Sequence, residues 1–172
     1  MARADITIRE TGGRNSVPTD RWVVASGQTT LIQAGEPAKQ TSAAIEEVIL
    51  LVDADLTVAT DQPMSGIAAT DSTETATAAG YSDQYVPLPD IKWEIKAKSA
   101  AAADTQAEID ALVGQLELID LATGTHGAFT MDTAAGSTGT NAFLIVGGDP
   151  NRSTVWFRIR PDACSFGRAT VA

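Results

Sequence analysis

Four aspartates in the middle of the chain are the first residues whose type and spacing could do chemistry. They are Asp53, Asp55, Asp61 and Asp71. Carboxylate oxygens are the ligands that Ca²⁺ prefers, so a calcium loop is one interpretation. Such a loop needs a glycine at its sixth position and a glutamate at its twelfth, and this segment has no such arrangement. We therefore interpret the four residues as an acidic surface turn and predict no metal site.

Residues 49–58 combine an apolar run with the pattern Asp-x-Asp-x-Thr at Asp53 and Asp55. The pattern resembles the first motif of haloacid-dehalogenase-like phosphatases. That resemblance implies Asp53 as the phosphoryl nucleophile and Asp55 as a general acid/base. Phosphoryl transfer also needs Mg²⁺ and a cation beside the phosphate, but no Lys or Arg follows until Lys92. We expect no enzymatic activity, and a phosphatase stays as the third hypothesis.

The chain has one cysteine, Cys164, and one histidine, His126. A single cysteine excludes an intrachain disulfide. Zinc needs more nitrogen and sulfur ligands than one histidine and a distant cysteine provide. We interpret Cys164 as a partly buried small apolar residue, with a nucleophilic thiol as the alternative. No cofactor is expected.

Charge is unevenly distributed along the sequence. The chain has 22 acidic and 12 basic residues and a formal net charge of −10, which disfavours binding to nucleic acid through phosphates. Between Gln40 and Ile91 there is no Lys or Arg, and basic residues return at Lys92. This acidic segment is either an ordinary solvated face or one side of a charge-matched contact, including a contact between copies of the chain.

Residues 1–30 are polar and contain the breakers Gly12-Gly13 and Val17-Pro18. We expect an extended N-terminal arm, followed by one β-rich domain over residues 31–172. The arm is either a partly disordered terminus or a segment that becomes ordered on a partner.

Aromatic and arginine side chains are the candidates for an interface. Core or subunit-interface packing is the default interpretation for each tryptophan, because aromatic side chains dominate both. The candidates are Trp22, Trp93, Trp156, Arg9, Arg14 and Arg21.

The pattern of residues predicts many short strands and one helix. Thr105 and Glu108 have the spacing of a capping box, Ile109, Leu112 and Val113 form an apolar stripe, and Gly114 supplies the stop. Residues 71–75 are interpreted as a turn and edge region closed by Gly80, and residues 147–151 as a turn. Strands are predicted at residues 48–52, 81–88, 91–97, 116–121, 128–132, 142–146 and 154–160. In residues 91–97 the alternation of a half-buried strand puts Ile91, Trp93, Ile95 and Ala97 on one face and Lys92, Glu94, Lys96 and Lys98 on the other. No internal repeat of fixed period is visible. The prediction is a mainly β body, a small β-barrel or β-sandwich with one short α-helix.

No apolar run is long enough to span a membrane, and the N-terminus lacks the apolar core of a signal peptide. We expect a soluble protein made in a reducing cytoplasm.

Several short phrases, in their order, resemble the capsid decoration (cement) proteins of tailed bacteriophages. The likeness covers roughly residues 31–160. Its parts are residues 34–37 (AGEP), residues 66–68 (GIA), residues 71–76 (DSTETA) with Gly80, the helix at 104–114, and residues 143–149 (FLIVGGD) leading into 155–158 (VWFR).

This resemblance implies a structural protein of the virion that binds the outside of the capsid and cements neighbouring major capsid protein subunits. It also implies a homotrimer and no catalytic residues. The expectation of no nucleic-acid and no membrane partner comes from the net charge and the lack of a long apolar run. The alternative is another virion part, such as a tail tube, a head–tail connector or a head fibre.

Overall fold

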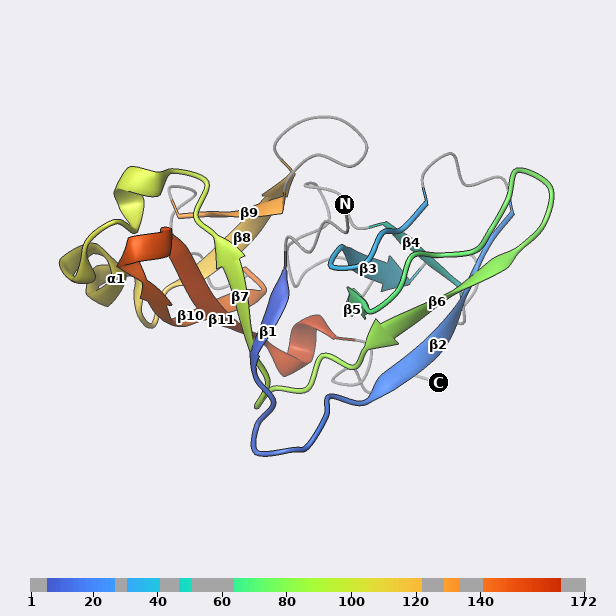
Figure 1. Ribbon diagram of the computed structural model, residues 1–172, viewed down its shortest axis with the longest axis horizontal. Coiled ribbons are helices and arrows are strands. Elements are labelled where there is room, and N and C mark those ends of the chain that lie inside the picture. The colour runs from blue at the N-terminus through green and yellow to red at the C-terminus, as the bar shows by residue number, and fades with distance from the viewer. Residues whose placement is uncertain are drawn as a thin grey trace.

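Two antiparallel sheets make up most of the computed structural model (Figure 1). The structure describes residues 6–26, 31–40, 47–50, 64–121, 129–133 and 141–164. The predicted mainly β fold with one α-helix is confirmed within these ranges.

The first sheet contains six strands in the order β1-β7-β11-β10-β8-β9. All its ladders are antiparallel. The strands are β1 (Thr7–Glu10), β7 (Lys92–Lys96), β8 (Leu116–Leu121), β9 (Phe129–Asp132), β10 (Phe143–Asp149) and β11 (Thr154–Ile159).

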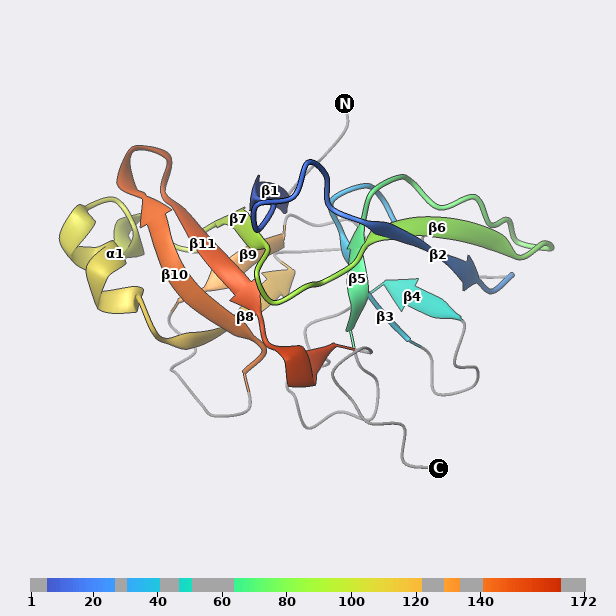
Figure 2. The same cartoon turned by 90° about the horizontal axis from the view of Figure 1, so that it is seen from below.

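The second sheet contains five strands in the order β2-β6-β5-β3-β4. The strands are β2 (Thr19–Val24), β3 (Pro37–Gln40), β4 (Val48–Leu50), β5 (Met64–Ala68) and β6 (Gly80–Tyr85). The N-terminal half of the chain thus forms one sheet and the C-terminal half the other, with β1 as the exception. Figure 2 shows the two sheets side by side, with β1 between them on the side of β7.

The two sheets share one topology. Numbering the strands of each half from one to five gives the order 1-5-4-2-3 for both β2–β6 and β7–β11. Among the described residues of each half, one parallel bridge then connects the first strand with the third, at their ends or directly beside them, at Val23–Glu47 and at Ala97–Met131. Each sheet therefore curls back on itself, and one bridge rather than a ladder makes the closing contact. The repeat lies in the fold and is not visible in the sequence.

The described part of the expected N-terminal arm is not irregular. Strand β1 pairs with β7, and β2 pairs with β6 along its whole length, from Thr19–Tyr85 to Val24–Gly80. Between the two strands the backbone turns at Gly12 and Gly13, which have φ angles of +65° and +81°. These angles lie in the left-handed region that favours glycine. The division into an arm and a domain stays a prediction, but residues 7–10 and 19–24 are edge strands of the two sheets.

The predicted positions of the later strands agree closely with the structure, and two segments differ. Strand β5 is fully buried and lies where no strand was predicted, whereas residues 71–75, the expected turn and edge region, lie outside any strand. Gly147 and Gly148 lie within β10, and the turn follows at Pro150–Arg152 with Ser153 in the left-handed conformation. The expected strand at residues 48–52 is observed as β4, and its last two residues lie outside the described ranges.

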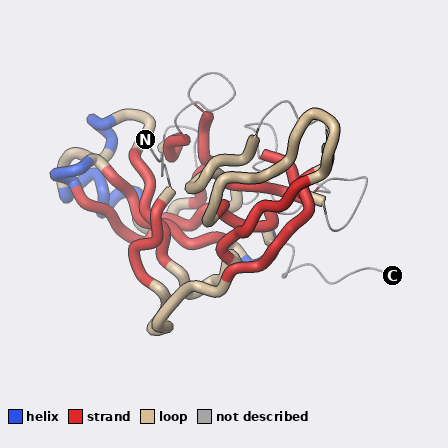
Figure 3. Tube along the Cα trace, turned by 45° about the vertical axis from the view of Figure 1, so that its right-hand side comes forward, coloured by secondary structure: helices blue, strands red, loops and turns tan. Residues whose placement is uncertain are grey.

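The α-helix α1 (Gln106–Leu112) begins with the predicted capping box. The Thr105 side chain accepts a hydrogen bond from the Glu108 amide, and the Glu108 carboxylate accepts one from the Thr105 amide. Ile109 and Leu112 are buried, but Val113 is 48% exposed and does not extend the apolar stripe. In Figure 3 the helix lies at the end of the molecule formed by the first sheet.

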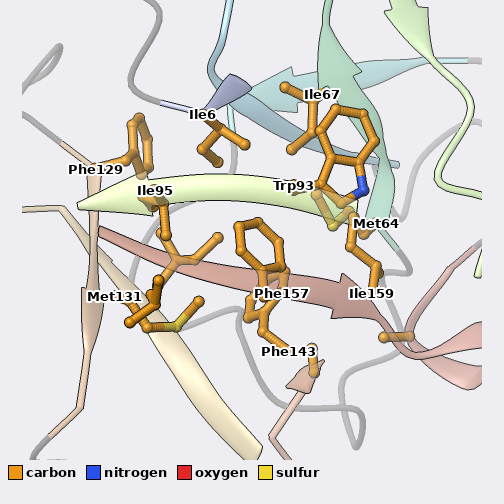
Figure 4. Close-up of a cluster of buried hydrophobic side chains, with 14 of the residues drawn as sticks. Ile6, Met64, Ile67, Trp93, Ile95, Phe129, Met131, Phe143, Phe157 and Ile159 are labelled. Carbon is orange, nitrogen blue, oxygen red and sulfur yellow. The ribbon is translucent and has the colours of Figure 1, made fainter. Parts of the chain in front are cut away.

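Trp93 lies where the two sheets meet. Its side chain is fully buried, and its ring centroid is 6.2 Å from that of Tyr85, on β6 of the other sheet. Figure 4 shows Trp93 beside Ile67 and Met64 of β5 and above Phe157. Phe157 packs edge-on against Phe143 with centroids 5.4 Å apart. The alternation predicted for residues 91–97 is confirmed on this face, since Ile91, Trp93, Ile95 and Ala97 are all buried.

Removing the Trp93 side chain should strongly destabilise the fold. Trp93→Ala leaves a large cavity between the sheets, and we expect the free energy of unfolding to fall by about 3–5 kcal/mol. Denaturant titration followed by circular dichroism measures this. Leu31→Ala is the matched control: Leu31 is 45% exposed, so its truncation should change stability by less than about 0.5 kcal/mol. Equal effects of both variants would contradict the central role of Trp93.

Candidate interaction surface

The outer face of strands β1, β7 and β11 carries Trp156 and most of the charged side chains that surround this tryptophan. In the ladders Thr7 lies opposite Glu94, and Glu94 lies opposite Trp156, so these three side chains share one face. Lys92, Lys96 and Arg158 fall on the same face by the alternation of the strands. We call this surface the tryptophan patch; it comprises Trp156, Arg9, Glu10, Lys92, Glu94, Lys96, Arg152 and Arg158.

The ring of Trp156 is held by a hydrogen bond at its indole nitrogen and by close packing on Gly147. Its indole nitrogen Nε1 donates a hydrogen bond to Glu94 Oε2 at 3.1 Å. Its ring lies on Gly147, directly opposite in the ladder, where a Cβ atom would come within 2.7 Å of the ring carbon Cε3. Gly148, the next residue, is covered by the Ile109 side chain of α1. These two glycines therefore permit close packing on β10, and this is why they do not form the predicted turn.

Two cations lie over the Trp156 ring. The guanidinium carbon of Arg9 is 4.9 Å from the ring centroid, and the Lys92 ammonium is 5.5 Å from it. Cations at this range are attracted by the negative face of an indole. Lys92 also pairs with Glu10 at 2.8 Å, and this hydrogen bond lowers the pKa of the Glu10 carboxyl. The arrangement fixes the orientation of the cations on the surface.

Glu94 is the buried part of the patch. Its side chain is 5% exposed, and its Oε1 atom lies 2.6 Å from Arg152 while Oε2 accepts from Trp156. Both carboxylate oxygens therefore have partners, as a buried charge requires. Sequence analysis placed Glu94 on the solvent side of β7; the structure covers it with Trp156 and Arg152.

The tryptophan patch has the opposite sign to the rest of the chain. It carries five cationic and two acidic side chains, a formal charge of +3, on a chain whose net charge is −10. Lys96, Arg152 and Arg158 are exposed and Trp156 is partly exposed. A preorganised aromatic ring with fixed cations can bind a surface that presents carboxylates beside an apolar contact.

Only two of the six predicted interface residues come together. Trp156 and Arg9 belong to the tryptophan patch, whereas Trp93 belongs to the core. Trp22 lies on β2, is partly buried, and packs against the core. The remaining two arginines pair within the chain, Arg14 with Asp90 at 2.5 Å and Arg21 with Asp83 at 2.7 Å.

These two ion pairs also bear on the acidic segment between Gln40 and Ile91. Two of its carboxylates are paired with arginines of the same chain. The hydrogen bond from Arg14 lowers the pKa of Asp90, and the one from Arg21 lowers that of Asp83. Part of the charge segregation along the sequence is therefore balanced inside one molecule.

Sequence reasoning missed Lys92, Glu94, Arg152 and Gly147 as parts of the patch. A signal was present in β11, where Val155, Phe157 and Ile159 alternate with Trp156 and Arg158. The alternation puts a tryptophan on the polar face of a strand, and an outward-facing tryptophan indicates a contact surface.

The remaining candidates for chemistry offer no site in the described part of the chain. Asp53, Asp55, Asp61 and His126 lie outside the described residues. The Asp71 carboxylate accepts a hydrogen bond from the Ala34 amide at 2.9 Å. Cys164 is buried as predicted, and burial raises the pKa of its thiol to about 12. Among the described residues, no group of three His, Cys, Asp or Glu side chains could hold a metal ion.

Glu117 is a buried carboxylate inside the first sheet. It lies opposite Phe143 in the β8–β10 ladder, is 0% exposed, and neither of its oxygens has a hydrogen-bond partner. Burial, with a smaller contribution from Asp132, raises the pKa of its carboxyl. The charged form is therefore disfavoured in the folded protein.

The comparisons with known proteins add no family. No family model, curated protein or solved structure matches the chain. No helix among the described residues is long and apolar enough to cross a membrane.

The pH dependence of stability should reveal Glu117. Its folded pKa is raised, so the neutral acid is present in both states at low pH, and stability is lost as pH rises through the folded pKa. Glu117→Gln should therefore raise the free energy of unfolding at pH 7 by about 1–3 kcal/mol, and the gain should vanish below about pH 4. Thermal unfolding of both proteins across this range measures the difference.

The matched control for this measurement is Glu108→Gln in the capping box. The hydrogen bond from Thr105 lowers the pKa of Glu108, so its stabilising effect is present at neutral pH and is lost on acidification. This variant should be less stable than the wild type at pH 7. If Glu117→Gln is also less stable than the wild type at pH 7, the charged form of Glu117 is not disfavoured in the folded protein, and the prediction is wrong.

Proposed function

We propose that the chain is a structural protein of a tailed-phage virion that binds the outer surface of the capsid and cements neighbouring major capsid protein subunits. The observation that carries the proposal is the tryptophan patch, a preorganised binding surface on the antiparallel first sheet. The sequence resemblance to capsid decoration proteins supplies the kind of partner.

The patch favours a protein partner with an acidic, partly apolar surface. Surface ion pairs contribute only about 0–1 kcal/mol each, so the Trp156 ring must provide much of the affinity. Arginine and tryptophan are the residues most enriched among interface hot spots. The cations over the ring would set the orientation of the partner and speed the encounter.

A homotrimer is part of the same proposal. Three chains on neighbouring sites would bring three patches to one shell, and linked contacts raise the apparent affinity far above that of one patch. Sedimentation of the free protein and of the protein released from particles tests this assembly state.

The position of the chain on the particle tests the function directly. Particles of the phage that encodes the chain would be prepared with and without it and imaged by cryo-electron microscopy. When the chain is present, we expect additional density on the outside of the shell. When it is absent, we expect the particles to lose their genome at a lower temperature. Density along the tail, at the head–tail connector or in a fibre would assign the chain to another virion part and contradict the proposal.

Replacement of Trp156 should weaken binding to particles that lack the chain. Trp156→Ala removes the hot-spot ring and the surface on which Arg9 and Lys92 lie, and we expect Kd to rise at least about 30-fold, equivalent to about 2 kcal/mol. Co-sedimentation with particles measures the affinity. Val113→Ala, which truncates an exposed apolar residue at the C-terminal end of α1, is the control and should bind like the wild type. Unchanged binding of Trp156→Ala to particles would contradict the assignment of this patch. Binding of the chain to duplex DNA instead of capsids would also contradict it.

A further inference from the structure

A second cation–aromatic pair occupies the corresponding place in the other half of the fold. In the β2–β6 ladder, Arg21 lies opposite Asp83 and Val23 lies opposite Tyr81, so Arg21, Asp83 and Tyr81 share one face. The guanidinium carbon of Arg21 is 5.8 Å from the centroid of the Tyr81 ring. Arg21 also holds Asp83 through two hydrogen bonds, of 2.7 and 3.0 Å.

The two places correspond by topology. Strands β2 and β6 are the first and last strands of the N-terminal half, and β7 and β11 are the first and last of the C-terminal half. In each half the first strand provides a cation, Arg21 or Lys92, and the last strand provides the aromatic ring beneath it, Tyr81 or Trp156. In both halves the same pair of strands also provides a carboxylate that contacts the cation–aromatic pair. Asp83 pairs with Arg21, and Glu94 accepts a hydrogen bond from Trp156.

The second pair is exposed. Tyr81 is 53% exposed, and the Arg21 side chain is 66% exposed. The Tyr81 ring therefore contributes little to the core, yet the ion pair with Asp83 holds the Arg21 guanidinium beside it. Aromatic and arginine side chains that are fixed before binding lose little conformational entropy on contact, which is the property of a binding patch.

We propose that Arg21, Tyr81 and Asp83 form a second binding patch, so that each chain binds two neighbouring copies of the same coat protein, one with each half of its fold. The inference rests on the proposed function. The two halves share one fold and carry a cation–aromatic pair at the same place. This arrangement fits a partner whose surface is itself repeated. On a shell, neighbouring coat subunits present that repeated surface, with acceptor groups such as carboxylates for the stacked arginines.

Two linked patches give a quantitative expectation. Once one patch is bound, the other is confined close to its site, and the apparent affinity exceeds that of either patch by about 10²–10⁴-fold. Loss of either patch should therefore reduce the chain to single-patch binding. The Arg9 and Lys92 cations add charge only to the tryptophan patch, so its single-patch affinity should depend more strongly on salt.

The experiment uses the full-length chain and capsids that lack it. Binding isotherms are measured for the wild type, Trp156→Ala, Tyr81→Ala, Arg21→Ala and the Trp156/Tyr81 double variant, with Val113→Ala as the control. We expect each single variant to raise Kd by about 10²–10⁴-fold, the double variant to show no measurable binding, and the control to match the wild type. Thermal unfolding confirms that each variant is folded, and Arg21→Ala tests the second patch without removing an aromatic ring.

The possible outcomes separate this inference from the function on which it rests. If the wild type does not bind capsids, the proposed function fails before any variant is compared. If the wild type and Trp156→Ala differ but Tyr81→Ala and Arg21→Ala bind like the wild type, the capsid role stands and the second patch is wrong. If Tyr81→Ala instead changes the assembly state of the free protein and leaves capsid affinity unchanged, the pair is a contact between copies of this chain, which also overturns the inference.

Discussion

The burial of Trp93 is the contact on which the rest of the structure depends. Its ladder neighbours are Ile8 of β1 on one side and Phe157 of β11 on the other, and its ring meets Tyr85 of the second sheet. One side chain thus connects the N-terminal strand, the centre of the first sheet and strand β6 of the second. A chain with few aromatic residues concentrates its hydrophobic stabilisation at this point, because a buried indole removes more apolar surface from water than any aliphatic side chain.

The two halves share a topology but differ in what they enclose. The fifth strand of the C-terminal half turns Val155, Phe157 and Ile159 inward, whereas that of the N-terminal half turns Gly80, Ser82 and Gln84 inward. Ser65 donates a hydrogen bond to Gln84 there, at 2.7 Å. The apolar half can therefore serve as the stable support of the tryptophan patch, while the polar half gains less from burial and depends more on the sheet that it contacts.

Local patterns in the sequence predicted much of this fold. The alternation of residues 91–97, the capping box at Thr105 and the strand at Leu116–Leu121 all depend on neighbours within a few positions, and the structure confirms them. The shared topology was not predictable, because strand order depends on contacts between residues far apart in the chain. For the same reason the patch was only partly found: Trp156 and Arg9 were candidates, but nothing in the sequence brings Lys92 and Gly147 beside them.

The ends of the described chain cross over between the halves. Strand β1 leaves the N-terminal half to pair with β7, and Cys164 returns from the C-terminal half to form a parallel bridge with Met64 of β5. During synthesis, β1 therefore has no partner until β7 has been made. The end of β5 at Met64, which β6 does not pair, is covered only when the segment containing Cys164 has been made. The N-terminal half is translated first but completed last. Its weakly apolar interior thus stays open on the ribosome, and the two halves must reach their final state together.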